Sequence, residues 1–223
     1  MKLTQPQYWA INMQIQLFEK TQAPSHHNLL PKDGSAYYYP EIIDELSSKQ
    51  LFETLIQSVD WRSDQIYIFG KKVTTQRKVA WVGDVNCSYT YSGVKKQPQP
   101  WTSELLSIKT QMEEIAQWKF NSCLLNLYHN GNEGMGWHSD NETELDSTAP
   151  IASLSLGATR KFAFKHKLDK SVSSLFLENG SVLIMHSPCQ ESWNHSLLKT
   201  KLPLPARMNL TFRAINPNHE LPK

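Results

Sequence analysis

The spacing of hydrophobic and polar residues changes about halfway along the chain. In the first half, apolar residues recur every three or four positions in two segments, which predicts amphipathic helices at 47–59 and 102–118. Ser47 and Gln50 are spaced as in a capping box and predict the start of the first helix. From about residue 121 onward the period is two, which is typical of β-strands. The chain is therefore predicted to have an α+β, mainly β fold.

The strand-like runs of the second half are short and follow one another closely. They are predicted at 122–128, 151–157, 160–166, 174–178, 181–186 and 207–215. Asn179-Gly180 lies between two of these runs and predicts a type I′ hairpin. Earlier runs at 65–70 and 79–83 are expected to pack against the same sheets. Many short strands joined by tight turns favour a sandwich, a barrel or a jelly roll.

Composition and charge restrict the class of protein. The chain has 223 residues, of which 39% are hydrophobic, so a core is expected, and the net charge of +2 excludes a strongly basic protein. No apolar run approaches the roughly 18 residues of a membrane span, and no secretion signal precedes the first helix. Cys87, Cys123 and Cys189 cannot all pair and form no CxxC motif, which is typical of a reducing compartment.

Candidate metal ligands follow two of the predicted strands. His138 and Asp140 form a His-x-Asp pair in a polar stretch punctuated by glycine, and His195 lies well downstream after another strand. The pair alone is close to the chance expectation, and a hydrogen-bonded loop histidine is the simpler interpretation. Two imidazoles and one carboxylate on one face of a metal form the facial triad of non-haem Fe(II) oxygenases. A zinc site with three protein ligands is the alternative.

The run from Arg207 to Arg213 alternates without interruption between polar and apolar residues. A strand would place on one face Arg207, Asn209, Thr211 and Arg213. Asn126 and Tyr128 share a face of an earlier strand in the same way. A half-solvated strand would show the same pattern, but inward-facing arginines require an anionic partner. A dicarboxylate co-substrate fits, because guanidinium and carboxylate pair through two parallel hydrogen bonds.

Together these motifs resemble the AlkB family of Fe(II)/2-oxoglutarate-dependent dioxygenases. The resemblance runs from about Tyr37 to Ile215 and includes the flanking text PIASLSLGATRKFAFKHK. It implies a double-stranded β-helix (jelly-roll) core with N-terminal helices and a nucleotide-recognition lid. The implied division is an N-terminal extension (1–35), helical support and lid (36–110), the dioxygenase core (111–216) and a C-terminal tail (217–223).

The resemblance also implies roles for individual residues. The ligands of Fe(II) would be His138, Asp140 and His195. The residues that hold 2-oxoglutarate would be Asn126, Tyr128, Arg207, Asn209, Thr211 and Arg213. O2 is the second co-substrate of the family, and no residue is assigned as a general acid or base.

Three features fit a nucleic acid that carries a cationic, alkylated base. Residues 71–96 and 160–170 are rich in Lys and Arg and suit a phosphate backbone, although a solvated face has the same composition. Residues 133–146 contain acids but no Lys or Arg, and a cationic base would be favoured there. Tyr89 and Tyr91 would stack on an extruded base, or are ordinary core tyrosines of a strand.

The resemblance assigns substrate contacts to a further group of positions. These are Phe69, Gly70, Lys71, Tyr89, Thr90, Tyr91, Asn141 and Glu142. Phe69-Gly70-Lys71 matches a finger loop, in which an apolar wedge fills the gap left by a flipped base. Asn141 departs from the acidic residue of the double-strand-specific relative, which leaves lesion and strand preference open, and Glu142 would supply the missing charge.

The expected function is oxidative dealkylation of bases of the 1-methyladenine and 3-methylcytosine type in direct DNA repair. Formaldehyde is released, and 2-oxoglutarate and O2 become succinate and CO2. The expected partner is DNA or RNA, and the expected protein is a monomer without membrane contact. Its expected location is the cytoplasm, at the nucleoid in a bacterium, or the nucleus in a eukaryote.

Three other functions stay open at this point. The same chemistry would act on RNA or on a protein side chain. A non-catalytic nucleic-acid-binding module would keep the fold with a degenerate core, but the complete triad and both arginines argue against it. A zinc hydrolase has weak support from His186-Ser-Pro-Cys189 near His195, and His186 and Cys189 are more simply structural residues.

Overall fold

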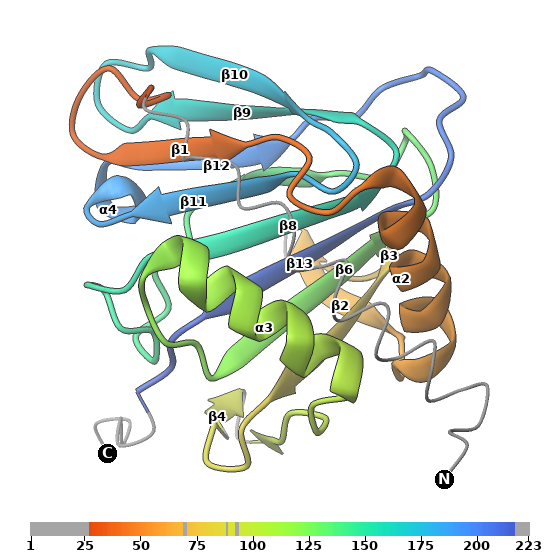
Figure 1. The fold of residues 1–223 in the computed structure, drawn as a ribbon. Coiled ribbons are helices and arrows are strands. Elements are labelled where there is room, and N and C mark those ends of the chain that lie inside the picture. The colour runs from red at the N-terminus through yellow and green to blue at the C-terminus, as the bar shows by residue number, and fades with distance from the viewer. Residues whose placement is uncertain (1–26, 69–70, 88, 92–93, 217–223) are drawn as a thin grey trace, which may run out of the picture.

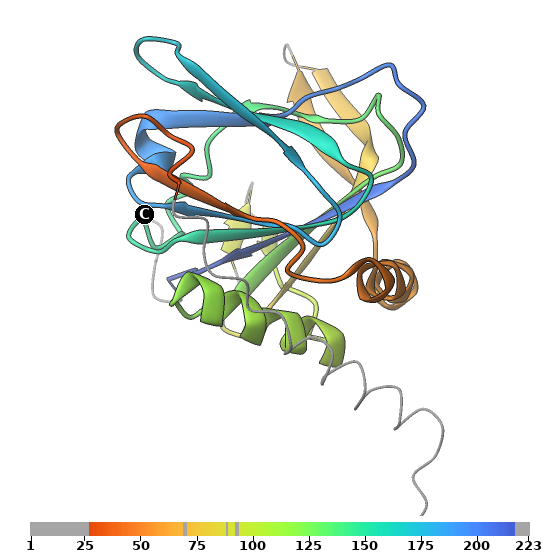
Figure 2. The same cartoon turned by 45° about the horizontal axis from the view of Figure 1, so that its top comes forward.

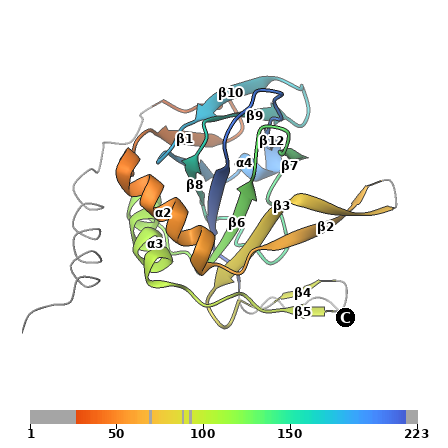
Figure 3. The same ribbon diagram turned by 90° about the vertical axis from the view of Figure 1, so that its right-hand side faces the viewer.

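The computed structural model describes residues 27–68, 71–87, 89–91 and 94–216 (Figure 1). In these residues two antiparallel sheets face each other, and two helices lie on the far side of the larger sheet (Figures 2 and 3). The predicted mainly β, jelly-roll fold with supporting helices is confirmed. No helix of the described part is long and apolar enough to cross a membrane.

The larger sheet has seven strands in the order β1-β11-β8-β13-β6-β3-β2. Their bounds are β1 Ser35–Tyr39, β2 Arg62–Ile68, β3 Lys71–Gly83, β6 Ser122–Tyr128, β8 Ile151–Gly157, β11 Val182–His186 and β13 Arg207–Arg213. β13 lies at the centre and pairs with both β6 and β8, so that Asn209 is opposite Asn126 on one side and Ser155 on the other. The strands that carry the predicted co-substrate residues are therefore direct neighbours.

The smaller sheet has four strands in the order β10-β9-β12-β7. Their bounds are β7 Met135–His138, β9 Arg160–His166, β10 Val172–Leu177 and β12 Trp193–Leu197. A short helix, α4 (Cys189–Ser192), precedes β12, and β4 (Tyr89–Tyr91) pairs with β5 (Val94–Lys96) in a separate ribbon. Aromatic residues such as Phe164 and Trp193 are fully buried on the inner side of the smaller sheet.

The strict alternation of β13 is explained by what covers each face. Met208, Leu210 and Phe212 are fully buried and pack in one cluster with the apolar faces of α2 (Glu45–Ser58) and α3 (Ser103–Ala116). The polar residues of the strand therefore face the space between the two sheets. A half-solvated strand is excluded, and the site lies between the sheets.

Two local predictions are wrong. α2 begins at Glu45 with Asp44 as its N-cap, whose Oδ1 accepts the backbone N–H of Ser47 at 3.0 Å, so Ser47 does not start a capping box. Asn179-Gly180 does not form a hairpin, because β10 and β11 belong to different sheets. The turn instead crosses between the sheets, and its polar groups bond to β8, where Asn179 Oδ1 accepts the N–H of Gly157 at 2.8 Å.

The segments before residue 111 contact the sheets of the predicted dioxygenase core directly. Residues 27–34 contact the smaller sheet, where Trp193 Nε1 donates to the carbonyl of Lys32 at 3.1 Å. The expected boundary at 110 falls inside α3, and β3 before it pairs directly with β6 after it. The division at 35, 110 and 216 stays a prediction.

Candidate metal and co-substrate site

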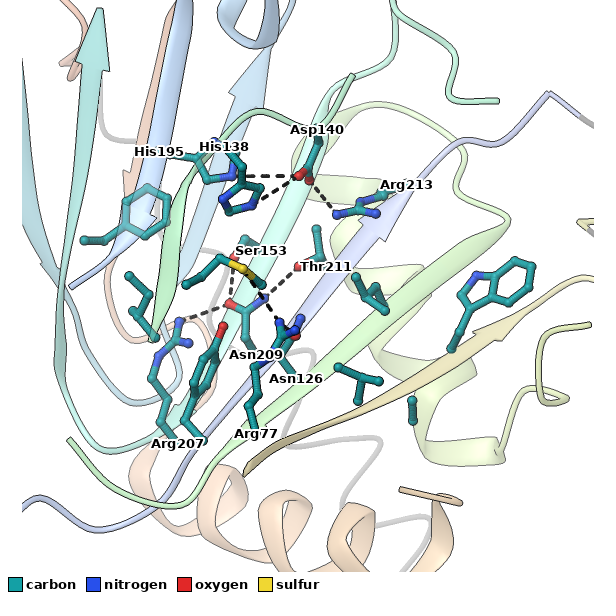
Figure 4. Close-up of a pocket in the computed structure, with 18 of the residues that line it drawn as sticks. Arg77, Asn126, His138, Asp140, Ser153, His195, Arg207, Asn209, Thr211 and Arg213 are labelled. Carbon is teal, nitrogen blue, oxygen red and sulfur yellow. Dashed lines mark hydrogen bonds and ion pairs between the residues drawn. The ribbon is translucent and has the colours of Figure 1, made fainter. Parts of the chain in front are cut away.

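Strand pairing in the smaller sheet brings the three predicted metal ligands together. His138 ends β7, and His195 lies directly opposite it in β12, with 4.3 Å between the ring centroids. Asp140 follows two residues after His138 and turns back toward both rings (Figure 4). In the described part of the chain, no other His, Cys, Asp or Glu residues form such a group.

The geometry of the three side chains suits one metal ion. Asp140 Oδ1 lies 3.6 Å from His138 Nε2 and 3.8 Å from His195 Nε2. All three ligand atoms lie within 4.8 Å of one another. Donor atoms about 2.1 Å from a common ion and at right angles would lie roughly 3 Å apart, so the side chains would move closer together around a metal. His138 Nδ1 lies 2.8 Å from the carbonyl of Gly136 and donates to it, which directs the Nε2 lone pair toward the site.

The charges of the group match what a metal requires. Burial lowers the pKa of His195 to about 4, so this imidazole is neutral at neutral pH. Burial alone would raise the pKa of Asp140, but the positive charge of Arg213 holds it below its ordinary value. Arg213 Nη2 donates to Asp140 Oδ2 at 2.6 Å. The neutral imidazole of His195 and the ionised carboxylate of Asp140 are the protonation states that bind a metal.

Arg207 occupies the other end of the same cavity, and no described residue gives it an anionic partner. Its side chain is 2% exposed, and its Nη2 donates to Ser155 Oγ at 2.8 Å and to Asn209 Oδ1 at 3.0 Å, which are both neutral. Its buried Nε has no hydrogen-bond partner. Burial lowers the pKa of Arg207 to about 10, and a buried cation of this kind is stabilised by a carboxylate.

The remaining predicted co-substrate residues line the wall between Arg207 and the metal ligands. Asn209 Nδ2 donates to Thr211 Oγ1 at 2.7 Å, and the ring of Tyr128 lies 5.7 Å from the Arg207 guanidinium carbon. All six predicted residues and the three metal ligands line one cavity of about 330 Å³. The structure thus brings together the residues that were predicted to act together.

Sequence reasoning missed the role of Arg77. It placed this residue in a basic segment facing phosphates, but the side chain is buried in the cavity wall, where Nη1 donates to Asn126 Oδ1 at 2.5 Å. That contact turns the amide nitrogen of Asn126 away from Arg77. The alternation of β3, in which Val79 and Trp81 also line the cavity, was the available signal.

Arg160 also departs from the expected phosphate-facing segment. It is fully buried, and its guanidinium donates to the backbone carbonyls of Asn130, Gly131, Glu133 and Leu198. His186 and Cys189 do not join the metal-ligand group; the ring of His186 contacts Tyr37, and burial raises the pKa of the Cys189 thiol to about 12. The zinc-hydrolase alternative therefore loses its second set of ligands.

The predicted substrate contacts are placed only in part. Asn141 is exposed, and Glu142, with its side chain 55% exposed, lies at the cavity 3.8 Å from Arg213 Nη1. Phe69 and Gly70 lie outside the described residues. Lys71 and the run Tyr89-Thr90-Tyr91 are described only as strand backbone, in β3 and β4. These base contacts stay predictions.

The fold and the site define a class of protein. The jelly roll carries two histidines and an aspartate at one end of a cavity and a buried arginine at the other end. This is the arrangement of an Fe(II)/2-oxoglutarate oxygenase, in which the arginine pairs with a carboxylate of the co-substrate. Residues 35–213 match the model of the 2OG-Fe(II) oxygenase superfamily. The chain belongs to this superfamily and, within it, to the AlkB family, and it is a dioxygenase that uses Fe(II), 2-oxoglutarate and O2.

Several relatives support this membership. The mouse protein named "DNA oxidative demethylase ALKBH2" is 35% identical, and the match covers 84% of this chain and 83% of the relative. The human protein of the same name is also 35% identical, over 82% of this chain and 74% of that one. The cattle protein named "Alpha-ketoglutarate-dependent dioxygenase alkB homolog 3" is 36% identical, and the match covers 80% of this chain and 65% of that protein.

A solved structure shares the fold. The structure described as "The structure of OsALKBH1" aligns with a TM-score of 0.57 and covers 80% of this chain and 97% of its own. At 19% identity it supports the fold alone.

Proposed function

We propose that this protein removes N-alkyl groups from DNA bases by oxidation, in direct repair of alkylation damage. The observation that carries the proposal is the single cavity that holds His138, Asp140 and His195 at one end and Arg207 at the other. The names of the relatives point to DNA as the substrate. The basic and aromatic segments of the sequence agree with a nucleic acid.

The residues at the two ends of the cavity would bind different groups. His138, Asp140 and His195 would hold the iron, and Arg207 would pair with the far carboxylate of 2-oxoglutarate. When bound, iron and 2-oxoglutarate supply the oxidation of the N-alkyl carbon by O2, with succinate, CO2 and formaldehyde as products. No residue of the chain has to remove a proton from the base.

The second arginine of β13 has a different part. Burial alone lowers the pKa of Arg213, but Asp140 and Glu142 raise it overall, so Arg213 stays charged. Its bond to Asp140 Oδ2 keeps that carboxylate ionised and oriented. Phe162 and Leu197 line the cavity from the smaller sheet and limit the access of water.

The charge at the cavity suits a cationic base. Glu142 is the acidic side chain that lines the cavity beside Asp140 and remains largely exposed. Its carboxylate would attract 1-methyladenine or 3-methylcytosine, which are positively charged, more strongly than an unmodified base. Exposed lysines such as Lys78 and Lys161 would contact phosphates. We further propose that the protein acts as a monomer, in the cytoplasm at a nucleoid or in the nucleus.

The proposal is tested with the purified 223-residue chain, Fe(II), ascorbate and 2-oxoglutarate. Oligonucleotides that carry one 3-methylcytosine or 1-methyladenine are supplied as single-stranded DNA, double-stranded DNA and RNA, and formaldehyde and repaired base are measured. We expect repair of DNA that requires 2-oxoglutarate and is lost in His138→Ala. Faster repair of RNA than of either DNA would replace DNA as the substrate, and repair that persists in His138→Ala or without 2-oxoglutarate would contradict the proposal.

A further inference from the structure

The segment that carries two of the three metal ligands is held from its outer side. Ser139 and Asp140 follow the end of β7 as irregular backbone. Lys167 Nζ donates to Ser139 Oγ at 3.0 Å and to the carbonyl of Gln190 at 2.8 Å. Gln190 Oε1 in turn accepts the backbone N–H of Asp140 at 2.9 Å. These bonds connect Ser139 to Lys167 and Asp140 to Gln190, which lie far from them in the sequence.

Lys167 and Gln190 are themselves anchored to regular structure. Lys167 follows β9 directly, and its backbone N–H donates to the carbonyl of Ser192 at 2.8 Å. Gln190 belongs to α4, and its Nε2 contacts Met185 Sδ in β11 at 3.5 Å. Both side chains are half-buried, so their hydrogen bonds are partly shielded from water and stronger than at an open surface.

We propose that Lys167 and Gln190 are positioning residues that hold Ser139 and Asp140 in the metal-binding arrangement before the metal arrives. The inference rests on the proposed role of His138, Asp140 and His195 as iron ligands. A loop that must be ordered during binding loses conformational entropy at that moment, and outer hydrogen bonds remove this cost in advance. Contacts of this kind orient ligands without touching the metal.

The sign of the effect separates positioning from simple electrostatics. The ammonium group of Lys167 repels a metal cation, so removal of its charge alone would strengthen metal binding. Loss of its hydrogen bonds to Ser139 and Gln190 would weaken metal binding instead. Lys167→Met keeps most of the side-chain stem and removes the donors, and Gln190→Leu removes the acceptor for the Asp140 N–H.

The test measures binding of Mn(II), a redox-stable substitute for Fe(II), to the metal-free 223-residue chain by titration calorimetry. We expect Lys167→Met and Gln190→Leu to weaken binding about 10–100-fold. Lys167→Arg, which keeps donors and charge, should recover most of the loss. Lys201→Met, which changes an exposed lysine in the loop between β12 and β13, is the matched control and should bind within about twofold of the wild type.

Each outcome decides one point. Wild-type or tighter Mn(II) binding in both Lys167→Met and Gln190→Leu would overturn the inference and leave the proposed function intact. Failure of the wild-type protein to bind Mn(II), or unchanged binding in His138→Ala, would contradict the proposed function instead. Thermal unfolding of the metal-free variants is measured in parallel. Weaker binding with a matching loss of stability, and without recovery in Lys167→Arg, would assign a merely structural role and also overturn the inference.

Discussion

At the scale of single residues, two buried charged groups of the cavity, Asp140 and Arg207, differ in their partners. Asp140 is paired with Arg213 at 2.6 Å. Among the described residues, Arg207 donates to the neutral groups of Ser155 and Asn209 and lies over the ring of Tyr128, and its Nε has no hydrogen-bond partner. A buried cation without an anionic partner lowers the stability of the folded state. The binding of a carboxylate to Arg207 would offset this unfavourable free energy, which explains why the protein has an arginine here.

Arg207→Met should therefore separate co-substrate binding from folding. We expect the KM for 2-oxoglutarate to rise at least about tenfold, because a charge-assisted pair worth about 1.5–3 kcal/mol is lost. The free energy of unfolding of the metal-free protein should not decrease, because a buried charge is removed. Oligonucleotide binding should be nearly unchanged. Steady-state kinetics, urea unfolding and oligonucleotide titration measure the three quantities. Parallel loss of DNA binding and stability would show misfolding and contradict this role.

His195 should make the stability of the metal-free protein depend on pH. Its pKa is about 4 in the folded protein because the ring is buried, against 6.5 for an ordinary histidine. Between these two values His195 binds a proton in the unfolded chain but not in the folded protein. The free energy of unfolding therefore falls as the pH drops from about 7 toward 4. We expect a decrease on the order of 1–2 kcal/mol between pH 7.5 and pH 5 from this group.

The measurement is urea unfolding of the metal-free protein at both pH values, with His195→Gln as the comparison. His186, whose pKa burial also lowers, contributes a decrease of the same sign in both proteins. The pH dependence should therefore become smaller in His195→Gln without disappearing. Equal pH dependence in the two proteins would contradict the neutral, buried state of His195.

Residue type alone did not reveal where charged side chains lie. The sequence placed Arg77 and Arg160 in basic segments, which are usually solvated, but both are buried. The two terminal nitrogens of Arg160 donate to backbone carbonyls, and Arg77 bonds to Asn126. Charge counts cannot separate such residues from exposed lysines, because burial depends on which strand faces cover each other.

At the scale of elements, periodicity predicted what local physics determines. The period of two predicted β13 and its two faces, because one face must pack on helices and the other contacts a polar cavity. The Asn179-Gly180 signal predicted a bend correctly but the wrong partners. Turn chemistry specifies how the backbone turns, whereas strand pairing depends on long-range packing. α2 begins before its predicted start, because Asp44 and Ser47 are both residue types that cap helices and Asp44 is the actual N-cap.

The Asn179-Gly180 crossing makes a prediction of its own. Gly180 has φ +71°, and a Cβ at this position would lie 1.9 Å from the carbonyl oxygen of Ile43. Gly180→Ala should lower the free energy of unfolding by about 2–3 kcal/mol, because both the backbone and the packing become strained. Gly136→Ala is the matched control, since nothing lies within 4 Å of a Cβ there. Equal urea midpoints for the two variants would contradict this account of the turn.

At the scale of the whole molecule, the site is a product of the two sheets together. The larger sheet supplies Asn126, Arg207 and Arg213, and the smaller sheet supplies His138 and His195 (Figure 4). These residues are distant in the sequence, and their convergence was predicted through the family resemblance and not through spacing alone. The helices α2 and α3 pack against the far face of the larger sheet, behind the cavity (Figure 2).

A crystal structure of the protein grown without oxygen, with Mn(II) and 2-oxoglutarate, tests the central claim most directly. The account predicts one metal ion bound by His138 Nε2, a carboxylate oxygen of Asp140 and His195 Nε2. It also predicts 2-oxoglutarate in the same cavity, with its far carboxylate on the Arg207 guanidinium. A metal bound elsewhere, or an Arg207 that keeps only its neutral partners while 2-oxoglutarate is bound, would contradict the account.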